Sequence, residues 1–212
     1  GNKIADYLIK PVNPNQLLLS LKKNLDHDKL VSEKTSSQYR QAFMQIGDDI
    51  SQATTYEDWV KIYNKIIHWE LELDQADDEG MSQILDNQKE EANNSFFKFI
   101  SNNYINWFKQ GQDKPVLSHT LLNNKVFNDL NDDGPTMLVV VDNLRFDQLR
   151  MIEPKIKEFY QKEHESAYYS ILPTATQYAR NAMFSGLMPL DMQKLFPDLW
   201  LNDTDEGGKN QY

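Results

Sequence analysis

Two oxygen-bearing side chains stand where chemistry on a phosphate ester is expected. Asp142 directly follows the β-branched run Val139-Val140-Val141, and Thr176 begins a stretch with helical spacing. In open α/β sheets, ligands bind beyond the carboxyl ends of the strands, and a helix amino terminus favours an anion. A carboxylate can ligate a divalent cation, which would activate a threonine hydroxyl as a nucleophile. The pairing at the ends of two successive strands predicts a shared metal site.

Each of these residues also has a purely structural interpretation. An aspartate after a strand can close a turn or cap the next helix, and a threonine before a helix usually caps it. The chain has no cysteine, so a metal would need Asp, Glu, His or hydroxyl ligands. The four histidines are scattered without the spacing of a ligand pair, and we expect them in surface or partly buried helical positions: His27, His68, His119 and His164. The residues alone leave both interpretations open.

The elements that must position the two side chains form an α/β pattern over 114–212. The run 137–141 predicts a strand covered on both faces, as in a parallel sheet. Residues 167–172 predict a second strand, and 176–184 predict a helix that ends at Gly186. Two strands are too few for a stable doubly wound sheet, so we expect further strands beyond this sequence.

The middle of the chain, 26–113, has helical periodicity throughout. Thr54-Thr55 marks the start of a second helix, and the acidic break 74–80 separates it from a third helix over about 81–110. The apolar positions that define the three stripes are Tyr39, Phe43, Ile46 and Ile50, then Ile62, Ile66, Trp69 and Leu73, then Phe97, Ile100, Tyr104 and Phe108. The pattern predicts an antiparallel three-helix bundle that spaces and orients its neighbours.

The first segment, 1–25, predicts one short strand and one helix. Residues 5–9 are apolar and aromatic, and Lys10-Pro11 ends the strand because proline has no amide donor. Asn13-Pro14 opens the helix, with Asn as N-cap and Pro at the first helical position.

Composition limits the class of function. The chain has 212 residues and a formal net charge of −10, without a basic stripe, so binding to duplex DNA is disfavoured. No apolar run approaches the roughly 20 residues that a membrane span needs, and the first residues lack signal-peptide character. We therefore expect a globular cytoplasmic protein.

The two motifs of the third segment carry a resemblance to a family. The string 138–147 is similar to the first metal-ligand motif of the nucleotide pyrophosphatase/phosphodiesterase branch of the alkaline phosphatase superfamily. Pro-Thr-Ala-Thr at 173–176, followed by Gly-Leu-Met-Pro at 186–189, resembles its nucleophile motif, and both strings resemble the PglZ variant. The resemblance implies two zinc ions, with Asp142 as a ligand of one and Thr176 as the nucleophile on it. It implies further Asp and His ligands outside this sequence.

The first segment resembles the end of a receiver domain, which has a flavodoxin-like fold. Asp6-Tyr7-Leu8-Ile9-Lys10-Pro11 matches the last receiver strand, where an aromatic residue precedes Lys-Pro. The resemblance implies that Lys10 senses the phosphorylated aspartate and that Tyr7 is the switch aromatic. The phosphoacceptor itself would lie upstream of this sequence.

Two further residues of the hydrolase motif, Arg145 and Asp147, match the family pattern, but we assign them to local structure.

The order of receiver, helical bundle and PglZ domain resembles response regulators of type IX secretion in Bacteroidetes. It implies a phosphorylation-controlled, zinc-dependent phosphodiesterase. The partners expected are a sensor histidine kinase, secretion-system or sigma-factor proteins, a nucleotide or oligonucleotide substrate, and a second copy of the chain. The alternative is a non-catalytic PglZ-like module that signals by docking to partner proteins. A transcription factor would need a basic helix-turn-helix, which the sequence does not show.

Overall fold

The computed structural model describes residues 14–76, 78–130 and 134–201 and forms two compact units. One unit comprises Gly1–Tyr104 together with Arg145–Met151, and the other comprises Ile105–Leu144 and Ile152–Tyr212. The sequence-predicted strand at 5–9, which includes Tyr7, lies outside the described residues, as does Lys10.

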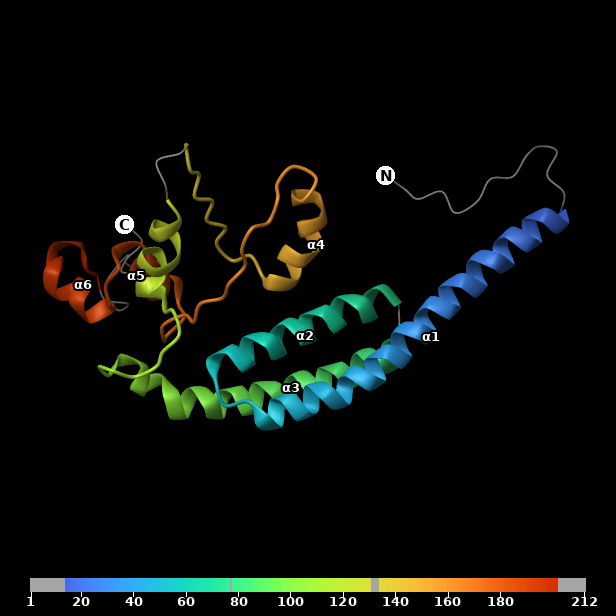
Figure 1. The fold of residues 1–212 in the computed structure, drawn as a ribbon, viewed down its shortest axis with the longest axis horizontal. Coiled ribbons are helices and arrows are strands. Elements are labelled where there is room, and N and C mark those ends of the chain that lie inside the picture. Colours follow the sequence, from blue (N-terminus) through green and yellow to red (C-terminus); the bar gives the residue numbers. More distant parts are fainter. Residues whose placement is uncertain (1–13, 77, 131–133, 202–212) are drawn as a thin grey trace. The chain divides into compact units, whose positions relative to one another are not determined.

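The first unit contains three long helices that lie side by side: α1 (Pro14–Gln52), α2 (Tyr56–Ala76) and α3 (Glu79–Asn103) (Figure 1). Each of these helices contacts the other two. The predicted three-helix bundle is therefore confirmed. α1 continues without a break through residue 25, so the domain boundary predicted there falls inside one helix, which runs past the ends of α2 and α3.

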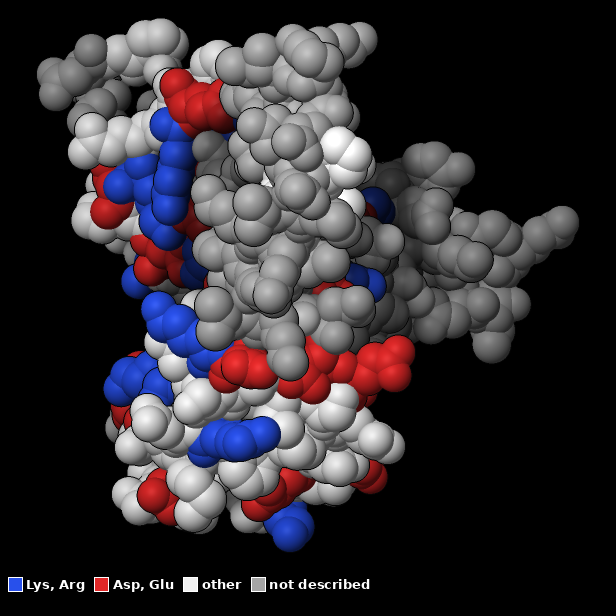
Figure 2. All heavy atoms as spheres, turned by 90° about the vertical axis from the view of Figure 1, so that its right-hand side faces the viewer, with Lys and Arg blue, Asp and Glu red and all other residues white. Residues whose placement is uncertain are grey.

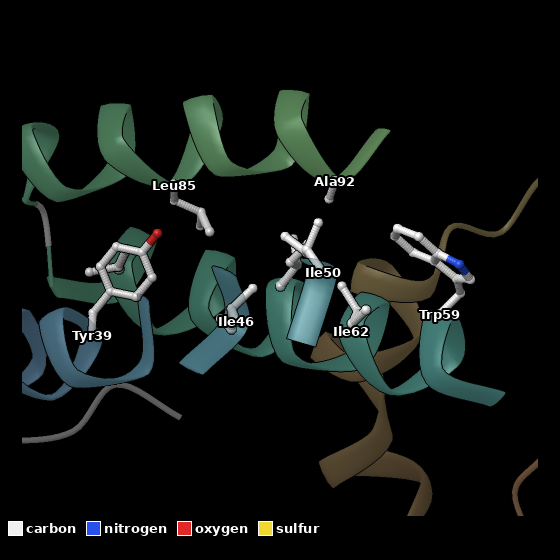
Figure 3. Packing of buried hydrophobic residues seen from close by; sticks show 9 residues of the cluster. Tyr39, Ile46, Ile50, Trp59, Ile62, Leu85 and Ala92 are labelled. Atoms are coloured by element: carbon white, nitrogen blue, oxygen red, sulfur yellow. The ribbon is translucent and has the colours of Figure 1, made fainter. Parts of the chain in front are cut away.

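The bundle core consists of the apolar stripes of the three helices (Figure 3). Tyr39 and Ile46 of α1 are 0% and 1% exposed, which confirms the predicted stripe on this helix. Ile62, Ile66 and Leu73 confirm the stripe on α2. Dense packing of such side chains, each removed from water, is the main stabilising contribution to the bundle.

The predicted core face of α3 is wrong. Phe97 is 69% exposed, and helix α3 ends at Asn103, before the 3₁₀ helix η1 (Tyr104–Phe108). The face that packs on the core instead carries Leu85, Gln88, Ala92, Phe96 and Phe99. These residues also recur at helical spacing, so the aromatic run in this helix offers two overlapping stripes and only one of them is buried.

Both joints of the bundle are fixed by hydrogen bonds at helix starts. Thr55 Oγ1 accepts from the Asp58 N–H at 3.2 Å, and Asp58 Oδ2 accepts from the Thr55 N–H at 3.0 Å, a reciprocal cap that confirms the predicted start of α2. Asp78 caps α3 by accepting from the Met81 N–H at 3.1 Å. The other carboxylate oxygen of Asp78 accepts from the hydroxyl of Ser36, which ties α1 to the start of α3.

The second unit is built from short helices. Its first part forms three short turns, η2 (Ser118–Thr120), η3 (Leu122–Val126) and η4 (Phe127–Asp129), the middle one a π-helix. Downstream lie α5 (Thr176–Ser185), α6 (Pro189–Leu195) and η5 (Pro197–Leu199). α4 (Phe146–Ile156) begins in the first unit and ends in the second.

The two strands predicted for the α/β domain are not formed in the described residues. Met137 to Val141 have no regular secondary structure, and each side chain is 47–85% exposed. Of the stretch 167–172, Tyr169 makes one isolated parallel bridge to Leu117, with its N–H on the Val116 carbonyl at 2.8 Å. A strand needs a partner with a matching row of backbone groups, and the described residues supply only this bridge.

Charges of both signs are mixed on the surface. On the face shown in Figure 2, the Lys and Arg side chains of the described residues lie among Asp and Glu side chains. None of the described helices is long and apolar enough to cross a membrane.

Candidate functional site

Asp142 lies in an exposed turn after the irregular run 137–141. Its neighbour Asn143 has φ 59°, a left-handed conformation that asparagine tolerates better than most residues. Asp142 does not cap the next helix, because α4 begins at Phe146 and Gln148 Oε1 accepts the Arg145 N–H at 3.1 Å. Of its two structural interpretations, the turn agrees with the structure and the cap does not.

Tyr168 is an electrostatic neighbour of Asp142 that sequence reasoning missed. Burial raises the pKa of the Tyr168 phenol, and the negative charge of Asp142 raises this pKa further. The phenol therefore remains protonated at neutral pH and can donate a hydrogen bond. No sequence signal linked the two residues, because Tyr168 was only one aromatic position within a predicted strand.

Thr176 is the first residue of α5, and its side chain is exposed. The N-cap position belongs to Ala175, whose carbonyl accepts from the N–H groups of Tyr178 and Ala179 at 3.0 and 2.9 Å. No side chain caps this helix, so the capping interpretation of Thr176 is wrong. The hydroxyl stands at a helix amino terminus, where the partial positive charge favours a bound anion.

The carboxyl end of α5 lies where the sequence predicts a helix stop. Gly186 ends the helix with φ 70°, and its N–H donates to the Ala182 carbonyl at 3.0 Å. The predicted helix and its glycine stop are confirmed. Gly186 thus defines the carboxyl end of the helix whose first residue is Thr176.

Arg145 and Asp147 satisfy each other, as the assignment to local structure predicted. Arg145 Nε donates to Asp147 Oδ1 at 3.0 Å, and Nη2 donates to Oδ2 at 2.6 Å. The hydrogen bonds from Arg145 lower the pKa of the Asp147 carboxyl. The Asp147 carboxylate is therefore occupied by Arg145, whereas Asp142 makes none of the described hydrogen bonds or ion pairs.

The chemistry of the two candidate residues fits part of a zinc site. A carboxylate and a hydroxyl are both oxygen donors, but a catalytic zinc ion usually takes three protein ligands. Within the described ranges, no hydrogen bond or ion pair joins Asp142 to Thr176, and no three His, Asp or Glu residues are grouped to hold a metal. These two residues could supply a portion of a ligand set and not the whole of it.

A hollow of about 310 Å³ lies beside α5 but away from Thr176. Its walls include Phe184, Met192 and Phe196, from the carboxyl-terminal half of α5 and from α6 and its end. Tyr178 and Trp200 make a ring contact, with centroids 6.3 Å apart, in the same unit. The hollow is mainly apolar, and neither candidate residue lines it.

Comparisons with protein families match two successive parts of the chain. Residues 29–108 match the PorX response regulator linker domain, and residues 121–212 match the BREX system PglZ alkaline phosphatase-like domain. The chain is a PorX-like regulator with a PglZ domain. No curated protein sequence matches it. The PorX-like linker match covers most of the bundle, and the PglZ match includes both Asp142 and Thr176.

A response regulator linker joined to an alkaline phosphatase-like domain fits a regulator with a phosphatase-like output. The linker also indicates a signalling partner such as a kinase. The alkaline phosphatase-like superfamily is usually metal-dependent, which agrees with the oxygen donors at the two motif positions.

Proposed function

We propose that the output of this PorX-like regulator is a zinc-dependent phosphodiester hydrolase, with Asp142 as a metal ligand and Thr176 as the nucleophile. The observation that carries the proposal is the position of Thr176. Its exposed hydroxyl is not used as a cap, and it stands at the amino terminus of a ten-residue helix inside the PglZ match. An uncapped hydroxyl at the positive end of a helix is suited to a phosphate.

The reaction follows from the chemistry of these side chains. The Thr176 oxygen attacks phosphorus, an Oγ–P bond forms, the ester P–O bond breaks, and the alcohol leaves with a proton. Water then releases the phosphoryl group from Thr176. When bound, zinc would lower the pKa of the hydroxyl and offset the negative charge that develops on oxygen. The partial positive charge at the start of α5 would favour the negatively charged phosphate during attack.

The proposed control is phosphorylation of a receiver domain by a sensor histidine kinase in the cytoplasm. Support comes from the response regulator linker match, and from the resemblance of Tyr7 and Lys10 to the receiver switch positions. A nucleotide or oligonucleotide is the proposed substrate class, and regulation of type IX secretion is the proposed role. Both follow from the resemblance rather than from a described contact.

The test is hydrolysis of bis(4-nitrophenyl) phosphate by the complete protein. We expect activity that a chelator removes and zinc restores, and a loss of at least roughly a hundredfold in kcat for Thr176→Ala. Ser166→Ala, an exposed hydroxyl of the same unit, is the matched control and should retain activity. Full activity in Thr176→Ala would end the nucleophile assignment. A complete protein that neither binds zinc nor hydrolyses the diester would favour the docking module.

A further inference from the structure

We propose that a hollow beside His119 binds a small aromatic carboxylate, with the carboxylate on Lys114 and the ring against Phe108. This His119 hollow has a volume of about 210 Å³, and its lining residues all lie between positions 107 and 124, within the second unit. The two residues assigned to the hydrolase site do not line it. The inference therefore goes beyond the proposed function and does not depend on it.

The imidazole of His119 supplies a buried polar atom that the fold does not use. Its Nδ1 is shielded from solvent and has no hydrogen-bond partner among the residues that the structure describes. Burial lowers the pKa of His119, and the charge of Lys114 lowers it further, against an opposing effect of Asp191. The imidazole is therefore mainly neutral at neutral pH, with one nitrogen that donates and one that accepts. Because an unpaired buried nitrogen is costly, a ligand that hydrogen-bonds to it would be favoured.

An aromatic pair forms one wall of the His119 hollow. The rings of Phe108 and His119 are stacked, with centroids 6.2 Å apart and planes inclined by 19°. Phe108 is still 39% exposed, so this wall has apolar area that a ligand can cover. Trp107 also lines the hollow, and its ring meets that of Tyr169 edge to face at 5.3 Å. Flat aromatic walls favour a flat ring as ligand, through buried area and ring contacts.

Lys114 supplies the positive charge at the hollow. Its side chain is exposed and makes none of the ion pairs between residues that the structure describes. The hydroxyl of Thr120, another lining residue, is already engaged, since it accepts from the Leu117 N–H at 3.0 Å and donates to the Leu117 carbonyl at 3.1 Å. An ammonium group forms a charge-assisted hydrogen bond with a carboxylate. Lys114 and His119 both lie outside the two family matches, so neither match accounts for them.

The lining segment is held in place by a neighbouring stretch of the same unit. The Ile171 N–H donates to Oγ of Ser118 at 3.1 Å, and Ser118 is fully buried. The Tyr169 N–H donates to the Val116 carbonyl at 2.8 Å. A lining that is ordered before the ligand arrives reduces the entropy lost on binding. The hollow is thus built into the fold of this segment.

The volume of the hollow selects a ligand with a single ring. Pockets for drug-sized ligands usually measure about 300–1,000 Å³, and this hollow is smaller. A hydroxyl group on the ring would suit either tautomer of His119, because a hydroxyl both donates and accepts. The simplest molecule that combines a ring, a carboxylate and a hydroxyl is 4-hydroxybenzoate, which therefore serves as the probe.

The test is a titration of the complete protein with 4-hydroxybenzoate, followed by ligand-observed NMR. We expect a Kd of about 1 mM or lower, as befits a ligand of this size. Lys114→Met should weaken binding at least roughly fivefold, because it removes the partner of the carboxylate. Lys125→Met is the matched control, since Lys125 is an exposed lysine of the same unit that does not line the hollow, and it should keep the parent affinity.

A second comparison varies the ligand and leaves the protein unaltered. The uncharged 4-hydroxybenzamide should bind the parent more weakly than the acid does. This preference for the acid should disappear in Lys114→Met, because two groups that interact show non-additive losses. Benzoate, which lacks the hydroxyl group, should also bind the parent more weakly than 4-hydroxybenzoate.

Three results would overturn the proposal. The first is an absence of saturable binding of 4-hydroxybenzoate in the millimolar range. The second is parent affinity in a folded Lys114→Met protein. The third is equal affinity for acetate or inorganic phosphate, which would show an anion site that makes no use of a ring. A protein that binds the aromatic acid but does not hydrolyse a phosphodiester would overturn the proposed function alone.

Discussion

The Tyr39 hydroxyl of α1 donates a hydrogen bond to Oε1 of Gln88 on α3, at 3.2 Å, in the middle of the bundle. Gln88 is 1% exposed, and its Nε2 donates to the Phe43 carbonyl at 2.9 Å. Both ends of a buried amide are thus satisfied by one face of α1. Because an unpaired buried polar group is costly, this arrangement favours a single register between the two helices.

Tyr39→Phe should lower the free energy of unfolding by about 1–2 kcal/mol, because it leaves Gln88 Oε1 buried without its donor. Urea unfolding followed by circular dichroism at neutral pH measures this. Tyr160→Phe is the control, since Tyr160 is 73% exposed, and it should change the value by less than about 0.5 kcal/mol. Equal stability of the two variants would show that the Tyr39 hydroxyl contributes nothing to the bundle.

Alkaline pH should weaken the bundle through the same residue. Burial, and then the charge of Asp86, raise the pKa of Tyr39 to about 12. The folded state therefore holds this proton more tightly than the unfolded state, whose tyrosine pKa is about 10. The contribution is fully present below pH 10 and is lost as the pH rises towards 12. The free energy of unfolding should fall more between pH 8 and pH 11 in the parent than in Tyr39→Phe. An identical fall in both proteins would contradict the assignment of this pH dependence to Tyr39.

Removal of the α3 cap should destabilise the bundle in a pH-dependent way. Asp78→Ala should cost about 1 kcal/mol at pH 7, a typical value for a lost N-cap. The hydrogen bonds from Ser36 and Met81 lower the pKa of Asp78, so its contribution is present above the unfolded pKa and disappears as the pH falls through the lower, folded value. Thermal unfolding at pH 7 and pH 2 checks this, with Glu79→Ala as the exposed neighbour. A cost that persists unchanged at pH 2 would argue against a cap made by the carboxylate.

The two aromatic neighbours in α3 should differ in their contribution to stability. Phe96 packs on the core and makes a ring contact with Trp59 at 5.3 Å, whereas Phe97 is 69% exposed. We expect Phe96→Ala to cost about 2–3 kcal/mol and Phe97→Ala less than about 0.5 kcal/mol in urea unfolding. A larger cost for Phe97→Ala than for Phe96→Ala would instead support the core face predicted from periodicity, which carries Phe97.

The bundle could be predicted from the sequence because its signals are local. The stripe from Tyr39 to Ile50 and the start of α2 after Thr55 depend on residues within a few turns of one another. The same is true of the stop of α5 at Gly186 in the other unit. Phe97 shows the limit of this reasoning. Where aromatic residues are nearly consecutive, periodicity defines a helix but not the side that faces the core.

The candidate site depends on contacts between distant residues, and less of it could be predicted from local sequence patterns. The run 137–141 has the composition of a buried strand, but a strand forms only where another supplies its hydrogen bonds. The effect of Asp142 on Tyr168 and the contact of Tyr63 with Phe146 join residues that no local pattern connects. The capping interpretation of Thr176 failed by one position, because helix boundaries are the least certain part of a sequence prediction.

The central claim is that Asp142 and Thr176 serve one hydrolytic site. The most direct measurement is a double-mutant cycle on kcat for bis(4-nitrophenyl) phosphate hydrolysis by the zinc-loaded complete protein. Residues that act as a unit show strongly non-additive losses, so Asp142→Ala, Thr176→Ala and the double variant should be similarly inactive. Losses that multiply in the double variant, or activity retained by either single variant, would contradict a shared site.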